Sequence, residues 1–295
     1  MISLKHTIMS PFSSADKVDD YLSRFLMTTA IITVLILLMI LVFIFKEAWP
    51  VFEEHDWKQL LKESWYPLEG QFGMLSMLWA SLAVSAGAIL LATPLGLASV
   101  IFEQFYAPRW LATCHRLMIA LLAGIPSVVF GLWGLTALVP ILTKIQPPGT
   151  SLLAAVLVLA LMILPTITLA SGAVLACVPR DLIAGAAALG MSQKSQILGV
   201  ALPAAYRGII GAVLLAAARA LGETMAVLMV AGNVVQNPSD PFKPVRVLTA
   251  NIALEMGYAT GLHRAGLFTS GLILTALVLI LSWLSTRTTR VRTHD

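Results

Sequence analysis

Long apolar segments alternate with short polar ones along most of this 295-residue chain. Six of the apolar segments are long enough for a helix to cross the hydrocarbon core of a bilayer, which takes about 20 residues. They cover residues 25–46, 73–102, 117–143, 151–173, 207–232 and 265–286. The pattern predicts an all-α, polytopic membrane protein with six transmembrane helices.

Composition supports the membrane class. The chain is 58% hydrophobic and 12% charged, whereas a soluble globular domain carries about 25% charged residues. The net charge of +4 is small and dispersed, so it does not indicate nucleic-acid binding. Cys114 and Cys177 fall in segments expected in the cytoplasm, which argues against a disulfide framework.

The segments around the spans indicate an orientation. Residues 1–24 and 287–295 are polar and predict two tails. Lys and Arg are more numerous on the side that carries these tails and the loop 174–206, so we expect that side to be cytoplasmic. Residues 25–46 form an apolar run too long for a signal-peptide core, and they predict an uncleaved anchor.

Residues 47–71 are acidic and carry interleaved aromatic residues, Trp49, Trp57, Trp65 and Tyr66. Aromatic side chains of this kind gather at the level of the lipid headgroups. The pattern predicts an amphipathic helix on the outer surface of the membrane. It is either a docking surface for an external partner or an anchoring linker, and the sequence favours neither.

Three of the four prolines within the predicted spans indicate an interrupted helix. A proline removes a backbone hydrogen bond from a helix. We therefore expect a kink at Pro94, a helix break at Pro126 and a second break at Pro165.

The polar stretch 181–203 has the signals of two short helices around a break at Gly190. Asp181 is a candidate N-cap for the first helix, and Ser192 for the second. Gly190 supplies the backbone freedom that ends the first helix. Pro203 stands where a third helix can begin.

This stretch resembles the cytoplasmic coupling loop of ABC importer permeases, whose pattern is E-A-A-x3-G-x9-I-x-L-P. Gly190 takes the position of the glycine, and Ala184 stands where the family has glutamate, so a charged contact with the ATPase is missing. The resemblance implies an ATPase-coupling site made of Ala184, Gly185, Ala186, Gly190, Met191, Ser192, Leu202 and Pro203.

Four further segments resemble phosphate-specific ABC importer permeases of the PstC type. They are EAWPVF after the first span, GIPSVVFGLWGL in the third, LMILPTI (161–167) and RALGETMAVLMVAGN (219–233). The resemblance implies a type I ABC importer permease fold, with residues 72–286 as the permease domain and 174–206 as its coupling loop. It also implies alternating access in the bacterial inner membrane.

The resemblance implies several partners: a second permease of the PstA type, two ATP-binding subunits, a periplasmic phosphate-binding protein and inorganic phosphate. The chain itself has no G-x-x-x-x-G-K-[ST] phosphate loop and no His/Cys cluster typical of a metal site. We therefore expect no cofactor, and ATP hydrolysis on another subunit. Two alternatives remain: a permease for sulfate, molybdate or a phosphonate, and an ion-driven secondary transporter.

Two charged residues lie inside the predicted fifth span, Arg219 and Glu223. Placed one turn apart on one helix, they would share a face. An intramembrane ionisable residue indicates a functional site. We expect Arg219 to bind a phosphate oxyanion, with Glu223 holding the guanidinium and Thr224 as a weaker hydroxyl contact. The alternative is a buried ion pair that fixes helix packing.

Overall fold

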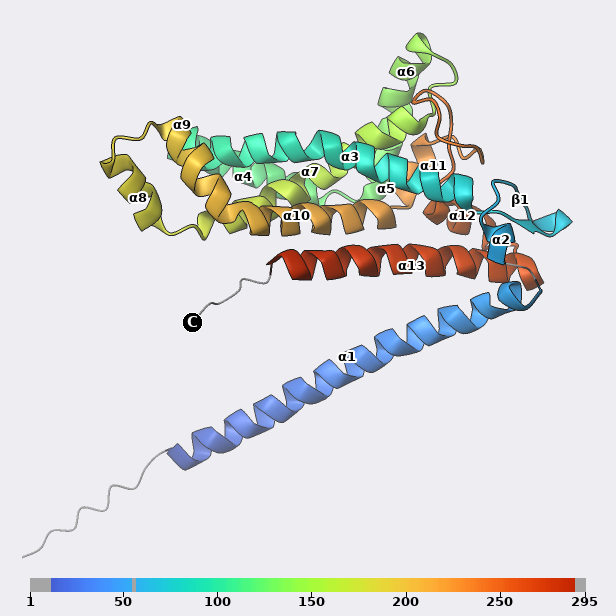
Figure 1. The fold of residues 1–295 in the computed structure, drawn as a ribbon, viewed down its shortest axis with the longest axis horizontal. Helices are drawn as coiled ribbons and strands as arrows, with labels where there is room; N and C mark the ends of the chain where they lie inside the picture. The colour runs from blue at the N-terminus through green and yellow to red at the C-terminus, as the bar shows by residue number, and fades with distance from the viewer. Residues whose placement is uncertain (1–11, 55–56, 290–295) are drawn as a thin grey trace, which may run out of the picture. The chain divides into compact units, whose positions relative to one another are not determined.

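The structure is a computed structural model that describes residues 12–54 and 57–289 (Figure 1). The outermost parts of both predicted tails lie outside these residues. The chain divides into two compact units, Met1–Glu47 and Ala48–Asp295. Within the described residues, six helices are long and apolar enough to cross a membrane, which confirms the predicted class and number of spans.

The first unit consists of the greater part of α1 (Phe12–Glu54). The candidate span within this helix is Tyr21–Glu54. The helix therefore begins well before the predicted anchor, and residues 12–24 of the predicted tail belong to it.

The second unit is built around α7 (Leu152–Ala176), which packs against α3 (Leu75–Ile101) and α10 (Leu202–Gly222). α13 (Gly261–Thr289) lies beside α10 (Figure 1). Small residues let these helices approach closely. A Cβ atom at Gly87 of α3 would stand 2.9 Å from Cγ2 of Val156 on α7, so the contact requires glycine there.

The three prolines at which a kink or break is predicted affect their helices differently. At Pro126 the chain breaks as predicted, between α4 (Arg109–Gly124) and α5 (Ser127–Trp133). The predicted break at Pro165 is wrong, because α7 runs through it without interruption. Pro94 likewise lies inside the continuous helix α3. Neighbouring helices support the backbone around an interior proline, whereas Ile125 and Pro126 are both extended.

Two candidate spans have bounds that differ from the predicted ones. The third candidate span is Ser127–Ile145, made of α5, the π-helical turn η3 (Gly134–Leu138) and α6 (Val139–Ile145), and α4 is separate from it. The fifth is Gln193–Gly222, and α11 (Met225–Val230) follows after a break. Hydropathy alone does not register a break between two apolar helices.

The prediction of a surface helix over residues 47–71 is also wrong. α1 ends at Glu54 and the short α2 (Trp57–Leu60) follows. Then β1 (Trp65–Tyr66) pairs antiparallel with β2 (Gln71–Phe72) around the 3-10 turn η1 (Pro67–Glu69). Gly70 closes this hairpin with a φ of 72°, a left-handed backbone conformation that residues with a side chain rarely adopt.

Candidate functional site

The stretch 181–203, which the sequence predicts to be a coupling loop, forms the expected pair of short helices. α8 (Arg180–Ala188) and α9 (Gln193–Gln196) are joined through Gly190, whose φ is 76°. A Cβ atom there would meet nothing within 4 Å, so the position requires glycine for its conformation and not for space. Oγ of Ser192 caps α9 by accepting from the amide of Ser195 at 3.3 Å, as predicted.

Other details of this stretch differ from the sequence prediction. The N-cap of α8 is Pro179, so the capping role predicted for Asp181 is wrong. Asp181 lies in the first turn, where the positive end of the helix dipole stabilises its negative charge. Pro203 is the second residue of α10, but the π-helical turn Ile197–Ala201 leads into α10 without a break, so no separate third helix begins at this proline.

The structure divides the predicted coupling residues by exposure. Ala184, Gly185, Gly190, Ser192 and Pro203 are exposed. Met191 and Leu202 are half-buried, whereas Ala186 is buried and is therefore directed into the chain and away from any partner.

Two exposed leucines of the same segment are not among the predicted coupling residues. Leu182 is 50% exposed and Leu189 is 84% exposed. With Gly185 they follow the i, i+3, i+7 spacing that places residues on one helix face. An exposed apolar pair beside small residues is the composition of a protein contact surface.

Glutamine side chains connect this segment to the helical bundle. Gln193 donates to the carbonyl of Phe105 in the π-helical turn η2 (Phe102–Tyr106) at the end of α3. Gln104 of the same turn donates to the carbonyl of Gly172 on α7 at 2.7 Å. No sequence pattern indicates these two hydrogen bonds, because their acceptors are backbone carbonyls on distant elements.

The break between α10 and α11 holds the second predicted site. Arg219 lies on α10 and is exposed, and its Nη1 donates to Oγ1 of Thr166 on α7 at 3.2 Å. Glu223 follows the end of α10 in extended conformation, with ψ of 128°, so the prediction that both residues share one helix face is wrong. Among the described side chains, no ion pair joins them within 4 Å.

Glu223 instead stabilises the break. Its Oε1 accepts from the amide of Ala226 at 3.2 Å, which satisfies a free donor in the first turn of α11. Its carbonyl accepts from Oγ1 of Thr249 on α12 (Leu248–Glu255) at 2.9 Å. Thr224 is half-buried, and its hydroxyl donates to the carbonyl of Gly222 at 3.4 Å.

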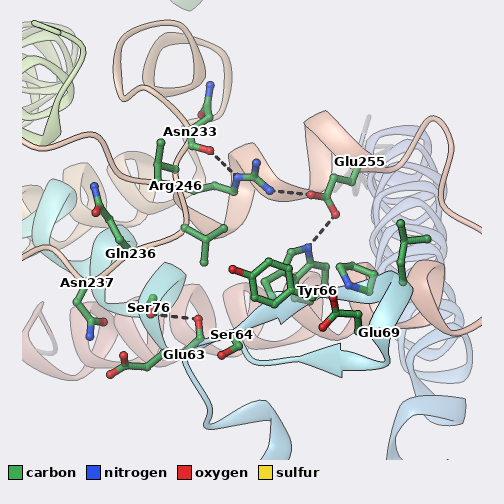
Figure 2. Close-up of a pocket in the computed structure, with 15 residues that line it drawn as sticks. Glu63, Ser64, Tyr66, Glu69, Ser76, Asn233, Gln236, Asn237, Arg246 and Glu255 are labelled. Carbon is green, nitrogen blue, oxygen red and sulfur yellow. Dashed lines mark hydrogen bonds and ion pairs between the residues drawn. The ribbon is translucent and has the colours of Figure 1, made fainter.

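A third site was not predicted. A cavity of about 740 Å³ lies between the hairpin and the loop that follows α11 (Figure 2). We call it the hairpin cavity. Its lining residues are Glu63, Ser64, Trp65, Tyr66, Pro67, Leu68, Glu69, Ser76, Asn233, Val234, Val235, Gln236, Asn237, Arg246 and Glu255.

Glu255 holds the walls of the hairpin cavity together. Its carboxylate accepts from Nη1 of Arg246 at 2.7 Å, from Nε1 of Trp65 at 2.8 Å, and lies 2.8 Å from Nε2 of His263. Arg246 also donates through Nε to the carbonyl of Asn233 at 2.9 Å. The hairpin, the loop, α12 and α13 therefore meet at one buried carboxylate (Figure 2).

The sequence of the chain is similar to curated transport proteins. The family described as "Binding-protein-dependent transport system inner membrane component" matches residues 89–290. A Bacillus subtilis protein named probable ABC transporter permease protein YqgH is 40% identical over 76% of each chain. The Mesorhizobium japonicum phosphate transport system permease protein PstC is 35% identical over 89% of this chain and 90% of its own. Its Haemophilus influenzae namesake is 33% identical over 88% and 91%.

Solved structures support the fold. Two crystal forms of the inward-facing MetNI methionine ABC transporter contain chains with TM-scores of 0.61 and 0.57 to this one, each at 20% sequence identity. The first match covers 77% of this chain and 100% of the other, and the second covers 72% and 94%. At this identity the likeness establishes the architecture, a type I ABC importer permease. With the family match and the nearly full-length relatives, it shows that this chain belongs to the binding-protein-dependent transport system inner-membrane components, among permeases of the PstC type.

Proposed function

We propose that this chain is a membrane-spanning subunit through which inorganic phosphate crosses the bacterial inner membrane by alternating access. Relatives that carry the name of a phosphate transport permease align over nearly its whole length, which supports this substrate. ATP is hydrolysed by partner subunits. Both termini and the α8–α9 segment lie in the cytoplasm, and the hairpin lies outside.

The observation that carries the proposal is the exposed guanidinium of Arg219 within a candidate span. Arg219 lies in the last turn of α10, three residues before the end of this span, and a charge inside a membrane span is costly when it faces lipid, so this face of α10 belongs against water or protein. A guanidinium presents paired donors that fit a phosphate oxyanion. Thr166 holds one nitrogen, which leaves the other donors for the anion.

The break after Gly222 adds a second feature to the pathway. Glu223 keeps α11 separate from α10, and its charge limits how tightly a phosphate anion binds nearby. Thr224, at the N-cap position of α11, is the weaker hydroxyl contact. In this proposal Arg219 binds, and Glu223 shapes the site without clamping the guanidinium.

The assembly comprises this chain, a second permease of the PstA type, two ATP-binding subunits and a periplasmic phosphate-binding protein. The exposed face of α8, from Leu182 to Leu189, docks on an ATP-binding subunit. Movement of that subunit reaches the bundle through Gln193, whose hydrogen bond to Phe105 joins α9 to the end of α3.

The test is uptake of radiolabelled phosphate into proteoliposomes that contain the whole complex. The variant Arg219→Gln should assemble and lose uptake by about 10-fold or more, because a hydrogen bond to a charged group contributes about 1.5–3 kcal/mol. Arg207→Gln is the matched control, since Arg207 is also exposed on α10 and lies three turns nearer its N-terminus.

The outcomes separate the substrate from the residue. If the parent complex takes up no phosphate, or excess sulfate abolishes its uptake, the proposed substrate is wrong. If Arg219→Gln and Arg207→Gln transport equally well, the assignment of Arg219 is wrong.

A further inference from the structure

The hairpin cavity is acidic. Glu63, Glu69 and Glu255 contribute three carboxylates to its lining, and Arg246 contributes the one cation, which leaves a net charge of −2. The guanidinium of Arg246 is already bound to Glu255 and Asn251. An anion such as phosphate would be repelled here, so the cavity is not part of the phosphate pathway.

The cavity offers acceptors that have no donor. Glu63 and Glu69 are exposed, and their side chains make no hydrogen bond or ion pair with the described residues. An occupant that brings several N–H donors and a positive charge matches this arrangement.

The walls of the cavity are fixed in place. Trp65 is 5% exposed and Phe72 is 1% exposed, and their rings pack edge to face at 5.9 Å. A Cβ atom at Gly266 of α13 would stand 2.8 Å from the ring of Phe72, so the hairpin lies directly on that helix. A site on such a support binds with a small loss of conformational entropy.

The tip of the hairpin bears apolar side chains that point into solvent. Leu68 is fully exposed and Tyr66 is 59% exposed, both beside the acidic lining. In Figure 2 Tyr66 and Glu69 lie on the hairpin side of the cavity, opposite Gln236 and Asn237. Exposed aromatic and aliphatic residues around a concave polar site are typical of a protein contact, and a Tyr face also attracts a cation.

We propose that the hairpin cavity is a socket for a lysine or arginine side chain of the external phosphate-binding subunit. The proposal rests on the function proposed above, which places the hairpin outside the membrane. The cationic head of that side chain lies between Glu63 and Glu69, while Tyr66 and Leu68 cover its stem. Docking at this cavity is the contact through which the phosphate-loaded binding protein stimulates ATP hydrolysis by the complex.

The test measures ATP hydrolysis by the reconstituted complex as phosphate-loaded binding protein is added. In the double variant Glu63→Gln/Glu69→Gln, the concentration of binding protein for half-maximal stimulation should rise about 10-fold, equivalent to about 1.4 kcal/mol. This half-maximal concentration should also depend less on salt concentration than in the parent complex. The maximal rate of ATP hydrolysis should not change. Glu54→Gln is the matched control, an exposed carboxylate of the same segment outside the lining.

Each outcome decides the proposal. An unchanged half-maximal concentration in the double variant overturns the socket while leaving phosphate uptake by the parent complex intact. Loss of the second permease from the purified variant also overturns it, because the cavity would then bind that subunit. A binding protein with one surface Lys or Arg changed to Glu should restore normal docking to Glu63→Lys/Glu69→Lys, and failure of every such change counts against a basic side chain. If the double variant does not assemble, each single variant should raise the concentration about threefold, half of the same energy.

Discussion

Replacing Glu255 should loosen the hairpin and its neighbours, because this carboxylate joins four segments. In Glu255→Ala, the guanidinium of Arg246 loses its only carboxylate among the described residues, and Trp65 and His263 lose an acceptor. The side chains of Glu255 and Arg246 are only 10% and 20% exposed. Removing one partner of a buried ion pair costs about 3–5 kcal/mol, and the partial exposure of Arg246 places this case near 3 kcal/mol.

The measurement is the thermal midpoint of the detergent-solubilised chain, followed by tryptophan fluorescence and by recovery of monodisperse protein. At about 2 °C per kcal/mol, the midpoint of Glu255→Ala should fall by about 6 °C. The midpoint of Glu255→Gln should fall less, because the amide oxygen of glutamine still accepts a hydrogen bond from one donor. Glu63→Ala is the control, since that carboxylate has no partner among the described residues and should leave the midpoint unchanged. Equal midpoints for Glu255→Ala and Glu63→Ala would refute the argument that this carboxylate holds the cavity walls.

Three further predictions concern coupling and orientation. Gly190→Val should uncouple ATP hydrolysis from uptake in the assembled complex, because a β-branched residue at a φ of 76° costs about 1–3 kcal/mol; Gly257→Ala, at an ordinary φ with open space around it and outside the α8–α9 segment, should couple normally in the same assay. Gln193→Ala should reduce phosphate uptake per ATP hydrolysed several-fold while Lys194→Ala does not, since only Gln193 bonds to Phe105. In a chain without Cys114 and Cys177, a membrane-impermeant maleimide added to intact spheroplasts should label a cysteine at position 58 and not one at position 194; the reverse pattern would invert the proposed orientation.

Local signals allowed correct predictions where neighbouring residues decide the backbone. Gly190 and Ser192 specify a turn and a cap within a few residues, and the structure has both. Pro126 ends a helix because the residue before it is also extended. The number of spans follows from the lengths of the apolar segments, which depend on no distant partner.

Predictions failed where distant residues decide the structure. Trp65 is an interfacial aromatic by its sequence neighbours, yet its indole binds Glu255, 190 residues away, and is buried. Pro165 lies within a helix that its neighbours hold straight. α12 lies in the polar stretch between two predicted spans, where hydropathy indicates no helix, and Arg246 before it pairs with Glu255 at its last residue.

α12 connects the hairpin cavity, which was not predicted from the sequence, to the break between α10 and α11, which the sequence predicts to be continuous helix. Near its first turn, Thr249 binds the carbonyl of Glu223 at the break between α10 and α11. At its last residue, Glu255 holds the hairpin through Trp65. Six residues of helix separate these contacts, a distance of about 9 Å along the axis. A short helix bonded at both ends moves as one piece, so a change at the hairpin cavity is expected to reach the break beside Arg219. Glu255→Ala should therefore lower phosphate uptake as well as the thermal midpoint, whereas a substitution of Glu63 should alter the docking of the binding protein alone.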